Sequence, residues 1–490
     1  MTIDRRNFPG TLAMLAMALL AACVNSSSTK TDTVTADSLA AESSIAAKSP
    51  PNFILIFTDD QRWDAIGYKN PMVVTPNMNE LAASGIRFDQ AIVTTAVCSP
   101  SRATLLTGRY ASANGVLNVD ESFLNEDEIC VSERLRDAGY ETSYFGKWHL
   151  KRPATPEQCG FDRALYFEGI ESYFDTNLIQ NGEPVSTSGY LEMNMAGEIS
   201  DYLREQARSD HGGKPFFIHY SPLAPHMDRN FAWPNTEETR RTYESLDPPI
   251  PNTWDSNLEG KPGYLATSRS RRRAIEVYGY EDPEAVRQHF RDYYGAVTDL
   301  DKAVGQILDT LEQTGLDRNT YVIFMGDNGW LMGEYKMTSK LLAYEASIRV
   351  PLIIAGPQID DGQISGALVT NADITPTLLD LAGLPVPVVI HGSSLKPLMK
   401  DGVREWRSSV LYEAPSSQHE VNPIRSLRTH DWKYIQTHEL GNLGKVIFEE
   451  LYDLSQDPDE TTNLAEEQAL RDIKVLLRRE LDNEVIRTSE

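Results

Sequence analysis

Short apolar runs recur along this chain from Asn52 onward, and each is followed by a polar loop and then by a helical stretch. Each run looks like a buried strand. The runs cover residues 52–57, 142–145, 216–220, 321–325 and 351–355. Strands that alternate with helices predict an α/β fold with a mostly parallel central sheet flanked by helices. Ligands of open α/β sheets bind outside the carboxyl ends of the strands, so the polar residues after these runs are candidates for one shared site.

Apolar residues spaced three to four apart predict helices at 131–138, 294–311 and 375–382. The stretch from about 228 to 290 is different, because it is rich in Pro, Arg, Asn and Glu and has no clear period. Such a stretch is typical of a long insertion. We expect it near the mouth of the site, where it would shape substrate choice.

The 490 residues are too many for one small core, and the pattern changes past about residue 400. Strand-like residues 425–436, a turn-rich stretch at 451–459 and a charged helix at about 464–485 follow. These elements predict a small C-terminal α+β subdomain with an antiparallel sheet at 401–490, after a main domain at 51–400.

Residues 1–23 have the layout of a secretory signal. Arg5 and Arg6 precede an apolar run at 12–20 that is too short to span a bilayer. The run ends in Leu20-Ala21-Ala22-Cys23, which resembles the bacterial lipobox, in which the cysteine is lipidated and becomes the mature N-terminus. The segment is therefore expected to be a lipoprotein signal peptide.

Residues 24–50 are rich in Ser, Thr and Ala and have no apolar period, so we expect a flexible tether. The expected product is an exported bacterial lipoprotein, periplasmic or at the cell surface, and membrane-anchored through Cys23. Arg5-Arg6-Asn7-Phe8 also resembles a twin-arginine signal, although the residues that follow depart from that pattern, so the export route stays open.

The charge balance limits the partners. Lys and Arg total 46 against 71 Asp and Glu, a formal net charge of −25. This charge repels nucleic acid, so no nucleic-acid partner is expected. If the substrate is anionic, a local basic cluster must bind it against that field.

The most informative segment is Cys98-Ser99-Pro100-Ser101-Arg102, which continues as Ala-Thr-Leu-Leu-Thr-Gly-Arg. Pro100 and the residues after it predict a helix that starts at Cys98, where free backbone N–H groups favour an anion. A cysteine in that position would be a nucleophile of low pKa, but no Cys-His-Asn context of a thiol enzyme is recognisable.

This segment resembles the signature of the type I sulfatases, a family of the alkaline phosphatase-like superfamily. Their Cys-x-Pro-Ser-Arg motif is recognised by a formylglycine-generating maturation enzyme, which oxidises the cysteine. The resemblance implies an alkaline phosphatase-like main domain and a catalytic formylglycine made from Cys98, positioned by Arg102.

Two strand-end motifs carry oxygen ligands. Asp59 and Asp60 follow the first apolar run, and Asp327 and Asn328 follow another. Carboxylate and amide oxygens suit Ca²⁺ or Mg²⁺ rather than zinc, although both motifs are also ordinary turn sequences. Both match the metal motifs of the sulfatases. The resemblance implies that these four residues join the formylglycine at position 98 around one Ca²⁺ ion, with Mg²⁺ as the less favoured ion.

The remaining candidates come from three further family-like segments. They are Gly146-Lys147-Trp148-His149-Leu150, the pair Pro225-His226, and Lys340 ahead of Arg349-Val350-Pro351. By resemblance, Lys147 binds sulfate and His149 contacts the formylglycine hydroxyl, while His226 and Lys340 hold the ester and assist the leaving oxygen. His219 is expected to be structural.

The chain departs from the family at Gly333-Glu334-Tyr335, where relatives often have Gly-Glu-His, so Tyr335 is not assigned to catalysis. Gln61-Arg62-Trp63 lies beside the first metal motif, where it could touch substrate or simply belong to the core. Cys130 and Cys159 could form a disulfide in an oxidising compartment or remain reduced and buried.

The expected activity is hydrolysis of sulfate esters, with a sulfated polysaccharide or oligosaccharide as substrate. One alternative is a phosphodiesterase or phosphonate monoester hydrolase of the same superfamily, because a metal, Lys and His can serve phosphorus as well as sulfur. Another alternative is a lipoprotein that binds sulfated glycans without cleaving them.

Overall fold

Strand β1 (Asn52–Thr58) lies inside the main sheet and is buried along its whole length. Phe53 and Phe57 belong to one buried cluster, whereas Ile54 and Ile56 belong to another. Successive strand side chains point to opposite faces, so both faces of the sheet are covered by other elements. This double burial explains why the strand is a continuous apolar run rather than an alternating one.

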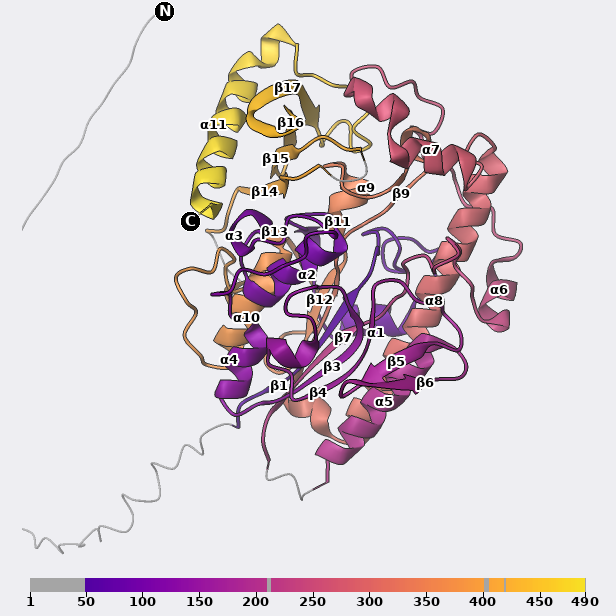
Figure 1. The fold of residues 1–490 in the computed structure, drawn as a ribbon, viewed down its shortest axis with the longest axis vertical. Helices are drawn as coiled ribbons and strands as arrows, with labels where there is room; N and C mark the ends of the chain where they lie inside the picture. Colours follow the sequence, from indigo (N-terminus) through magenta and orange to yellow (C-terminus); the bar gives the residue numbers. More distant parts are fainter. Residues whose placement is uncertain (1–48, 209–212, 401–404, 418–419, 490) are drawn as a thin grey trace, which may run out of the picture. The chain divides into compact units, whose positions relative to one another are not determined.

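The computed structural model describes residues 49–208, 213–400, 405–417 and 420–489. Within them, an eleven-stranded sheet has the order β11-β2-β12-β8-β1-β7-β3-β4-β5-β6, and β13 pairs with β2 (Figure 1). Its further strands are β2 (Gly85–Ile92), β3 (Glu141–Trp148), β4 (Arg163–Glu168), β5 (Asn177–Gln180), β6 (Glu183–Ser186), β7 (Phe216–Ser221), β8 (Thr320–Gly326), β11 (Arg349–Val350), β12 (Leu352–Ala355) and β13 (Gln363–Thr370).

The centre of this sheet is parallel. Strands β8, β1, β7, β3 and β4 pair parallel to one another, whereas β12 pairs antiparallel with β8 and β2. The mostly parallel sheet expected from the sequence is confirmed. The register places Thr58 opposite Gly326 and Gly146 opposite Ser221. Four strands therefore end at one edge, and the residues that follow them meet there.

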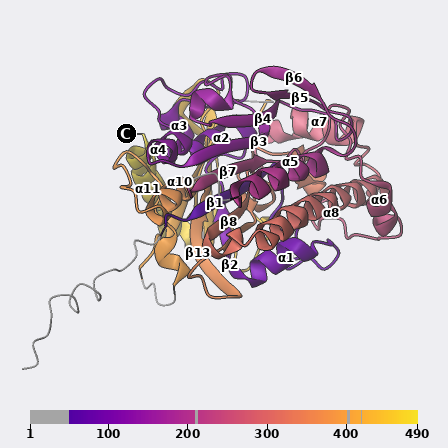
Figure 2. The same ribbon diagram turned by 90° about the horizontal axis from the view of Figure 1, so that it is seen from below.

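Helices cover both faces of the sheet (Figure 2). One face carries α1 (Pro76–Ala83), α5 (Leu191–Gln206) and α8 (Pro283–Gln313), whose apolar residues join the cluster of Ile54 and Ile56. The other carries α2 (Cys98–Thr107), α4 (Val131–Asp137) and α10 (Ile374–Leu381), which join the cluster of Phe53 and Phe57. The short α3 (Ala111–Asn114) follows α2.

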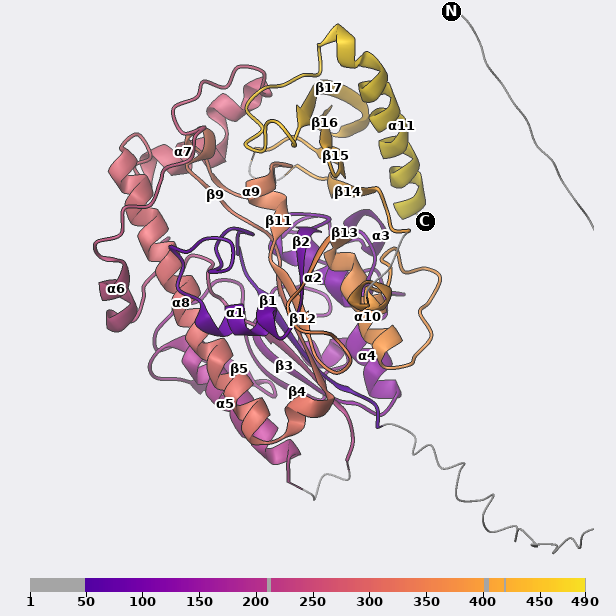
Figure 3. The same cartoon turned by 180° about the vertical axis from the view of Figure 1, so that it is seen from behind.

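The C-terminal part forms a four-stranded antiparallel sheet, as expected (Figure 3). Its strands are β14 (Ser409–Ala414), β15 (Ile424–Thr429), β16 (Trp432–Glu439) and β17 (Asn442–Asp453). Helix α11 (Arg471–Thr488) packs on it through Leu477 and Leu481. The strand-like stretch 425–436 is thus a hairpin of two strands, and the charged helix begins later than expected.

The stretch 228–290 is more regular than its composition suggested. It contains α6 (Glu237–Tyr243) and α7 (Arg269–Glu276), and α8 already begins at Pro283. The side chain of Asp282 accepts a hydrogen bond from Glu284 N, and Pro283 occupies the first turn, which is a favoured helix start. These local signals set the start of α8 eleven residues before the expected 294.

A short hairpin and a short helix follow β8 near the site. Strands β9 (Leu331–Met332) and β10 (Thr338–Ser339) form a hairpin, and α9 (Glu345–Ile348) follows. The buried Tyr335 lies between them, where its hydroxyl donates to the carbonyl oxygen of Glu460 at 2.8 Å. Tyr335 therefore joins the hairpin to the C-terminal part, in keeping with its exclusion from catalysis.

Cys130 and Cys159 form a disulfide, with their Cα atoms 5.7 Å apart. Of the two states left open by the sequence, the structure has the paired one. In the described part of the chain, Cys98 is the free cysteine, and no helix is long and apolar enough to cross a bilayer. The predicted signal peptide with Cys23 and nearly all of the expected tether lie outside the described residues.

Glu192 on α5 makes stability depend on pH. Its carboxylate accepts hydrogen bonds from the Tyr220 hydroxyl at 2.5 Å and from Ala224 N at 2.9 Å, and burial raises its pKa to about 7. The neighbouring charge of Asp59 raises it further. Because the folded pKa exceeds the unfolded value, the stability contribution is complete below the unfolded pKa of about 4.3 and is lost as pH rises through 7.

We therefore expect Glu192 to lower the free energy of unfolding by about 3 kcal/mol between about pH 4.3 and pH 7. Urea unfolding of the wild type and Glu192→Gln at pH 5 and pH 7.5 measures this, because the glutamine does not titrate. The free energy of unfolding of the wild type, relative to that of Glu192→Gln, should be lower at pH 7.5 than at pH 5. An unchanged difference would contradict the assignment.

Candidate active site

The site lies where the parallel strands end. Asp59 and Asp60 follow β1, Asp327 and Asn328 follow β8, and Lys147 is the seventh residue of β3. All five are at most 1% exposed. Asp60 N donates to Asp327 Oδ1 at 3.0 Å, so the two strand ends are directly joined.

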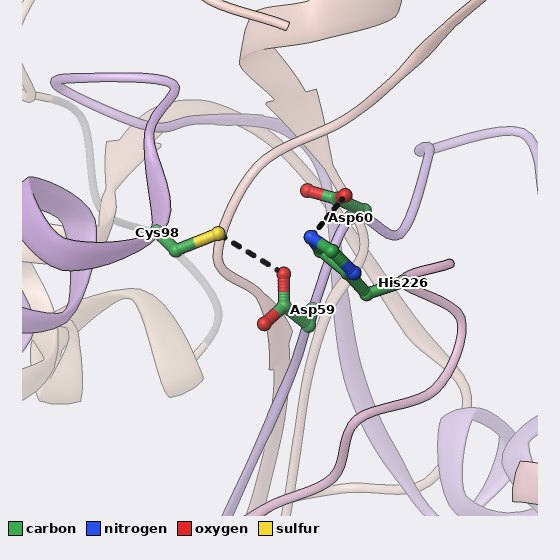
Figure 4. Close-up of side chains that lie close together, drawn as sticks. All are labelled: Asp59, Asp60, Cys98 and His226. Atoms are coloured by element: carbon green, nitrogen blue, oxygen red, sulfur yellow. Dashed lines mark hydrogen bonds and ion pairs between the residues drawn. The ribbon is translucent and has the colours of Figure 1, made fainter. Parts of the chain in front are cut away.

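Cys98 is the first residue of α2, as expected, and is 2% exposed. Its thiol donates to Asp59 Oδ1 at 3.2 Å, while Lys340 Nζ donates to the sulfur at 2.7 Å (Figure 4 shows the contact with Asp59). Burial, followed by the charge of Asp59, raises the pKa of this thiol. The thiolate of an ordinary cysteine enzyme is therefore disfavoured at this position.

Two buried cations balance the carboxylates around Cys98. Arg102 Nη2 donates to Asp59 Oδ2 at 3.0 Å and to Asp327 Oδ2 at 3.1 Å. Lys147 Nζ lies 2.6 Å from Asp59 Oδ2 and 3.8 Å from the Cys98 sulfur. Burial alone would raise the pKa of Asp59, but these cations, with His226 and Lys340, hold it well below its usual range.

Asp60 and Asn328 carry the strongest indication that the site can hold a cation. Asn328 Nδ2 donates to Asp60 Oδ1 at 2.6 Å, and Lys340 also donates to that oxygen. Asp60 Oδ2 and Asn328 Oδ1, in contrast, are buried and accept no hydrogen bond from the residues that the structure describes. Buried acceptors of this kind are costly unless another group binds them, and a hard cation would do so.

The pKa values of the acidic residues also indicate that the site can hold a cation. Burial raises the pKa of Asp60 to about 7 and that of Asp327 to about 6, and neighbouring carboxylates contribute to both shifts. Ligand atoms of Asp59, Asp60, Cys98 and His226 all lie within 4.8 Å of one another. Two of these four are carboxylates, and the carboxylate and amide at the end of β8 add further oxygen ligands, which suits Ca²⁺ or Mg²⁺.

The two histidines flank this cluster differently. His226 Nε2 lies 3.5 Å from Asp60 Oδ2, and its Nδ1 is hydrogen-bonded to the Met227 carbonyl oxygen at 2.6 Å, so Nε2 faces the site (Figure 4). His149 has no hydrogen bond to Cys98. Its carbonyl oxygen accepts from Ser99 Oγ at 2.6 Å, and its buried Nδ1 has no partner among the described residues. Burial and then Lys147 lower the pKa of both imidazoles.

The glycine before Lys147 is required by close packing. Gly146 has φ of +102°, and a Cβ atom there would lie 2.0 Å from the Ser221 carbonyl oxygen. Any other residue would push β3 away from β7. Gly146 therefore fixes the position of the Lys147 ammonium.

Sequence reasoning missed two supporting residues. Ser221 Oγ accepts from Arg102 Nη1 at 2.9 Å, and its place at the carboxyl end of β7 was an available signal. Tyr293 on α8 donates to the Asp60 carbonyl oxygen at 2.6 Å and accepts from Arg62 N at 2.9 Å. No sequence signal marks it, because a tyrosine on a buried helix face usually belongs to the core.

Three other candidates lie outside the cluster. Arg62 is held by Asp64 and Glu334, and the Trp63 ring is covered by the Arg349 guanidinium at 4.0 Å. His219 is buried in β7 and hydrogen-bonded to Ser221 at 3.2 Å, as expected of a structural residue. None of them contacts Cys98.

Comparison with known families shows which family the chain belongs to. The sulfatase family model matches residues 51–384, and the model for the C-terminal region of N-sulphoglucosamine sulphohydrolase matches residues 333–487. The chain belongs to the sulfatase family. It is a sulfuric ester hydrolase of the alkaline phosphatase-like superfamily, as its sequence indicated.

Several relatives of this sulfatase are characterised. An N-acetylglucosamine-6-O-sulfatase of Bacteroides thetaiotaomicron is 30% identical, with 84% of this chain and 82% of the relative covered. An ulvan-active sulfatase of Formosa agariphila is 31% identical, with 84% and 77% covered. A protein solved with its substrate D-glucosamine-2-N,6-O-disulfate has a TM-score of 0.78 and 27% identity, covering 90% of this chain and 98% of its own.

A phosphonate monoester hydrolase of Agrobacterium radiobacter also shares the fold. It has a TM-score of 0.70 and 23% identity, with 89% of this sulfatase and 96% of that chain covered. At this identity the likeness concerns the fold alone.

Proposed function

We propose that this sulfatase removes sulfate from a sulfated glycan, using a formylglycine made from Cys98 and one bound Ca²⁺ ion. The observation that carries the proposal is the placement of Cys98 between Asp59 and Lys340, in the signature that resembles the formylglycine motif. Relatives that act on sulfated N-acetylglucosamine and ulvan support the glycan class.

The residues that would hold the ion are Asp59, Asp60, Asp327, Asn328 and position 98. The acceptors without donors on Asp60 and Asn328, and the raised pKa values of Asp60 and Asp327, fit a bound cation. When bound, the ion and the formylglycine would together supply an acidified hydroxyl as nucleophile for the ester sulfur.

The chain's own cations bind and orient the sulfate. Lys147 and Lys340 both reach the Cys98 sulfur, at 3.8 Å and 2.7 Å, so their ammonium groups can neutralise sulfate oxygens beside the nucleophile. Arg102 keeps Asp59 and Asp327 in place through its two hydrogen bonds. Holding these groups before the substrate arrives avoids reorganisation during the reaction.

The histidines handle protons. The Nδ1–H of His226 donates to the Met227 carbonyl oxygen, so Nε2 faces the site as the nitrogen that can take up a proton. Once protonated there, beside the negative charge of a bound sulfate ester, Nε2 would pass this proton to the leaving alcohol oxygen, with Lys340 nearby. His149 offers a buried Nδ1 without a partner, which can accept a proton from a hydroxyl at position 98. Each proton transfer thus has its own residue.

Removal of the metal should lower stability. We expect chelation with EGTA to reduce the free energy of unfolding by about 3 to 4 kcal/mol relative to protein with Ca²⁺ at about 100 to 1,000 times its dissociation constant. Added Ca²⁺ should restore it more effectively than Mg²⁺, as measured by thermal unfolding. Asp60→Asn is the matched control, because it should lose the response to Ca²⁺. An equal response in both proteins would place the ion elsewhere.

The proposed activity is tested by expressing the chain with a formylglycine-generating enzyme. The mass of the peptide containing Cys98 should show an aldehyde in place of the thiol, and the protein should release sulfate from a panel of sulfated glycans. The rate of cleavage of phosphate and phosphonate esters is measured in parallel, to compare sulfur with phosphorus substrates. An unmodified thiol beside an active maturation enzyme, or faster cleavage of the phosphorus esters, would overturn the proposal.

We also propose that the enzyme is exported and anchored through Cys23, in the periplasm or at the cell surface. The lipobox-like end of the signal supports this, and a disulfide suits an oxidising compartment. Metabolic labelling with a fatty acid should mark the wild type and not Cys23→Ala.

A further inference from the structure

Helix α7 carries four arginines at positions 269, 271, 272 and 273, in a chain whose net charge is −25. Arg271 donates to the Tyr335 carbonyl oxygen, and Arg272 pairs with Glu420 at 2.7 Å. These two stabilise the surrounding fold. Arg273 is different, because in the described part of the chain no carboxylate pairs with its guanidinium and no acceptor is hydrogen-bonded to it.

Arg273 is held beside the catalytic centre. Ser270 of α7 donates to the carbonyl oxygen of Thr338 in β10, two residues before Lys340. Arg273, Ser339 and Lys340 consequently line one small pocket together with Val421. The pocket has a volume of about 20 Å³, which suits one oxygen or one water rather than a sugar ring. A larger group would lie over its mouth.

The other side of Arg273 is aromatic. Its guanidinium lies 5.0 Å from the centre of the Phe231 ring, which is 43% exposed and follows His226 by five residues. The loop is fixed, because Asp228 Oδ1 accepts from Asn230 N at 2.8 Å and from Ala232 N at 3.1 Å. The exposed ring offers an apolar face for a sugar ring, and the guanidinium beside it offers a positive charge for an anionic group on that sugar.

The guanidinium of Arg273 has no ion pair with a carboxylate in the described part of the chain. Partial burial lowers the pKa of its guanidinium, although the negative charge of Asp60 acts in the opposite direction. A planar guanidinium is suited to two parallel hydrogen bonds with a sulfate or a carboxylate. We assign Lys147 and Lys340 to the sulfate that is cleaved, which leaves Arg273 available for a different anion.

We propose that Arg273 binds a second oxyanion of the substrate, next to the sulfate that is cleaved, and so selects sugars with two anionic groups. This inference rests on the proposed function. It adds a specificity-determining residue from the insertion to a centre built by the strands. The oxyanion is a sulfate or a carboxylate, since both match the same guanidinium.

The test compares wild type, Arg273→Gln and Arg272→Gln in binding and in turnover. Titration calorimetry measures the affinity for glucosamine 6-O-sulfate, which has one anionic group, and for two sugars with a second one. These are D-glucosamine-2-N,6-O-disulfate and a 6-O-sulfated glucosamine linked to a uronate. The value of kcat/KM is measured on the same sugars and on 4-nitrophenyl sulfate. We expect Arg273→Gln to lose about 10- to 100-fold in affinity and kcat/KM for a two-anion sugar only. Arg272→Gln should match the wild type.

The possible results differ in how strongly each protein prefers sugars with two anionic groups over sugars with one. The disulfate and the uronate identify whether sulfate or carboxylate is favoured. The inference would be overturned if the wild type bound one-anion and two-anion sugars equally, or if Arg273→Gln kept the preference for two-anion sugars. It would also be overturned if Arg273→Gln lost as much kcat/KM on 4-nitrophenyl sulfate as on the two-anion sugars. A preference that depends on Arg273 without release of sulfate from any ester would instead reject the proposed function and leave the inference standing.

Discussion

Cys98→Ala should reduce sulfate release by at least about 10⁴-fold, because the variant has no atom that can become the aldehyde. The sulfur lies 3.2 Å from Asp59 Oδ1 and 2.7 Å from Lys340 Nζ, so its removal takes out the group on which the binding residues converge. The rate of sulfate release from the best glycan of the panel measures the effect.

The folded state should survive this change. Cys98 is 2% exposed at the start of α2, and alanine is compatible with a helix and removes a single heavy atom. Thermal unfolding of the variant without added Ca²⁺ therefore serves as the control for folding. Cys98→Ser keeps a hydroxyl at the position but offers no thiol to the maturation enzyme, so it too should turn over poorly. Wild-type rates in either variant would reject the nucleophile at position 98.

The strand ends of the site could be predicted because they obey a general rule. Asp59 and Asp327 each follow an apolar run, and parallel strands place their carboxyl ends together. The observed register of Thr58 opposite Gly326 brings those carboxylates to one edge. The position of Cys98 could be predicted for a similar reason, because Pro100 and the following residues specify a helix start.

Other parts of the site depend on tertiary packing that the sequence pattern does not predict. Lys340 lies between Ser339 and Leu341, whose φ angles of 80° and 85° belong to the left-handed region. Side chains rarely adopt that conformation, and no glycine or asparagine marks it. The family resemblance identified Lys340, whereas its direction toward Cys98 comes from tertiary contacts. Arg273 lies in the stretch 228–290, whose sequence has no clear period, so no pattern marks this arginine as a site residue.

The disulfide illustrates the same limit. Cys130 precedes α4 and Cys159 ends a short 3₁₀ turn, 29 residues away. Pairing requires their Cα atoms to come within about 7 Å, which depends on how the two elements pack. The sequence could therefore name both states but not choose between them.

Lys433→Met should destabilise the folded protein by about 3 to 5 kcal/mol, because it removes the cation from a buried ionic cluster. Lys433 on β16 is 0% exposed, and its Nζ lies 2.8 Å from Glu345 Oε1 and 2.7 Å from Glu460 Oε1. Burial alone would raise the pKa of Glu345, but Lys433 and then Arg428 hold it far below its usual range. Without Lys433, Glu345 would keep its ion pairs with Arg428 and Arg349, whereas the Glu460 carboxylate would lose the cation 2.7 Å away.

Urea unfolding measures this loss, and Lys445→Met is the matched control. Lys445 pairs with Glu439 at 2.6 Å, but its side chain is 59% exposed, so water screens the pair and the expected cost is below about 1 kcal/mol. Similar costs for both variants would contradict the buried-charge argument. Lys433→Met combined with Glu460→Gln should recover part of the loss, because one unpaired carboxylate is then removed.

The cluster also explains how the C-terminal sheet supports the catalytic centre. Glu345 is the first residue of α9, five residues after Lys340, while Lys433 belongs to β16 of the C-terminal sheet. Glu345 N donates to Glu460 Oε2 at 2.7 Å, which ties the start of α9 to the segment after β17. Loss of Lys433 should therefore loosen the segment that carries Lys340 before the main sheet unfolds. Hydrogen exchange in residues 340–348 should increase in Lys433→Met, while exchange in β1 should change only with global stability.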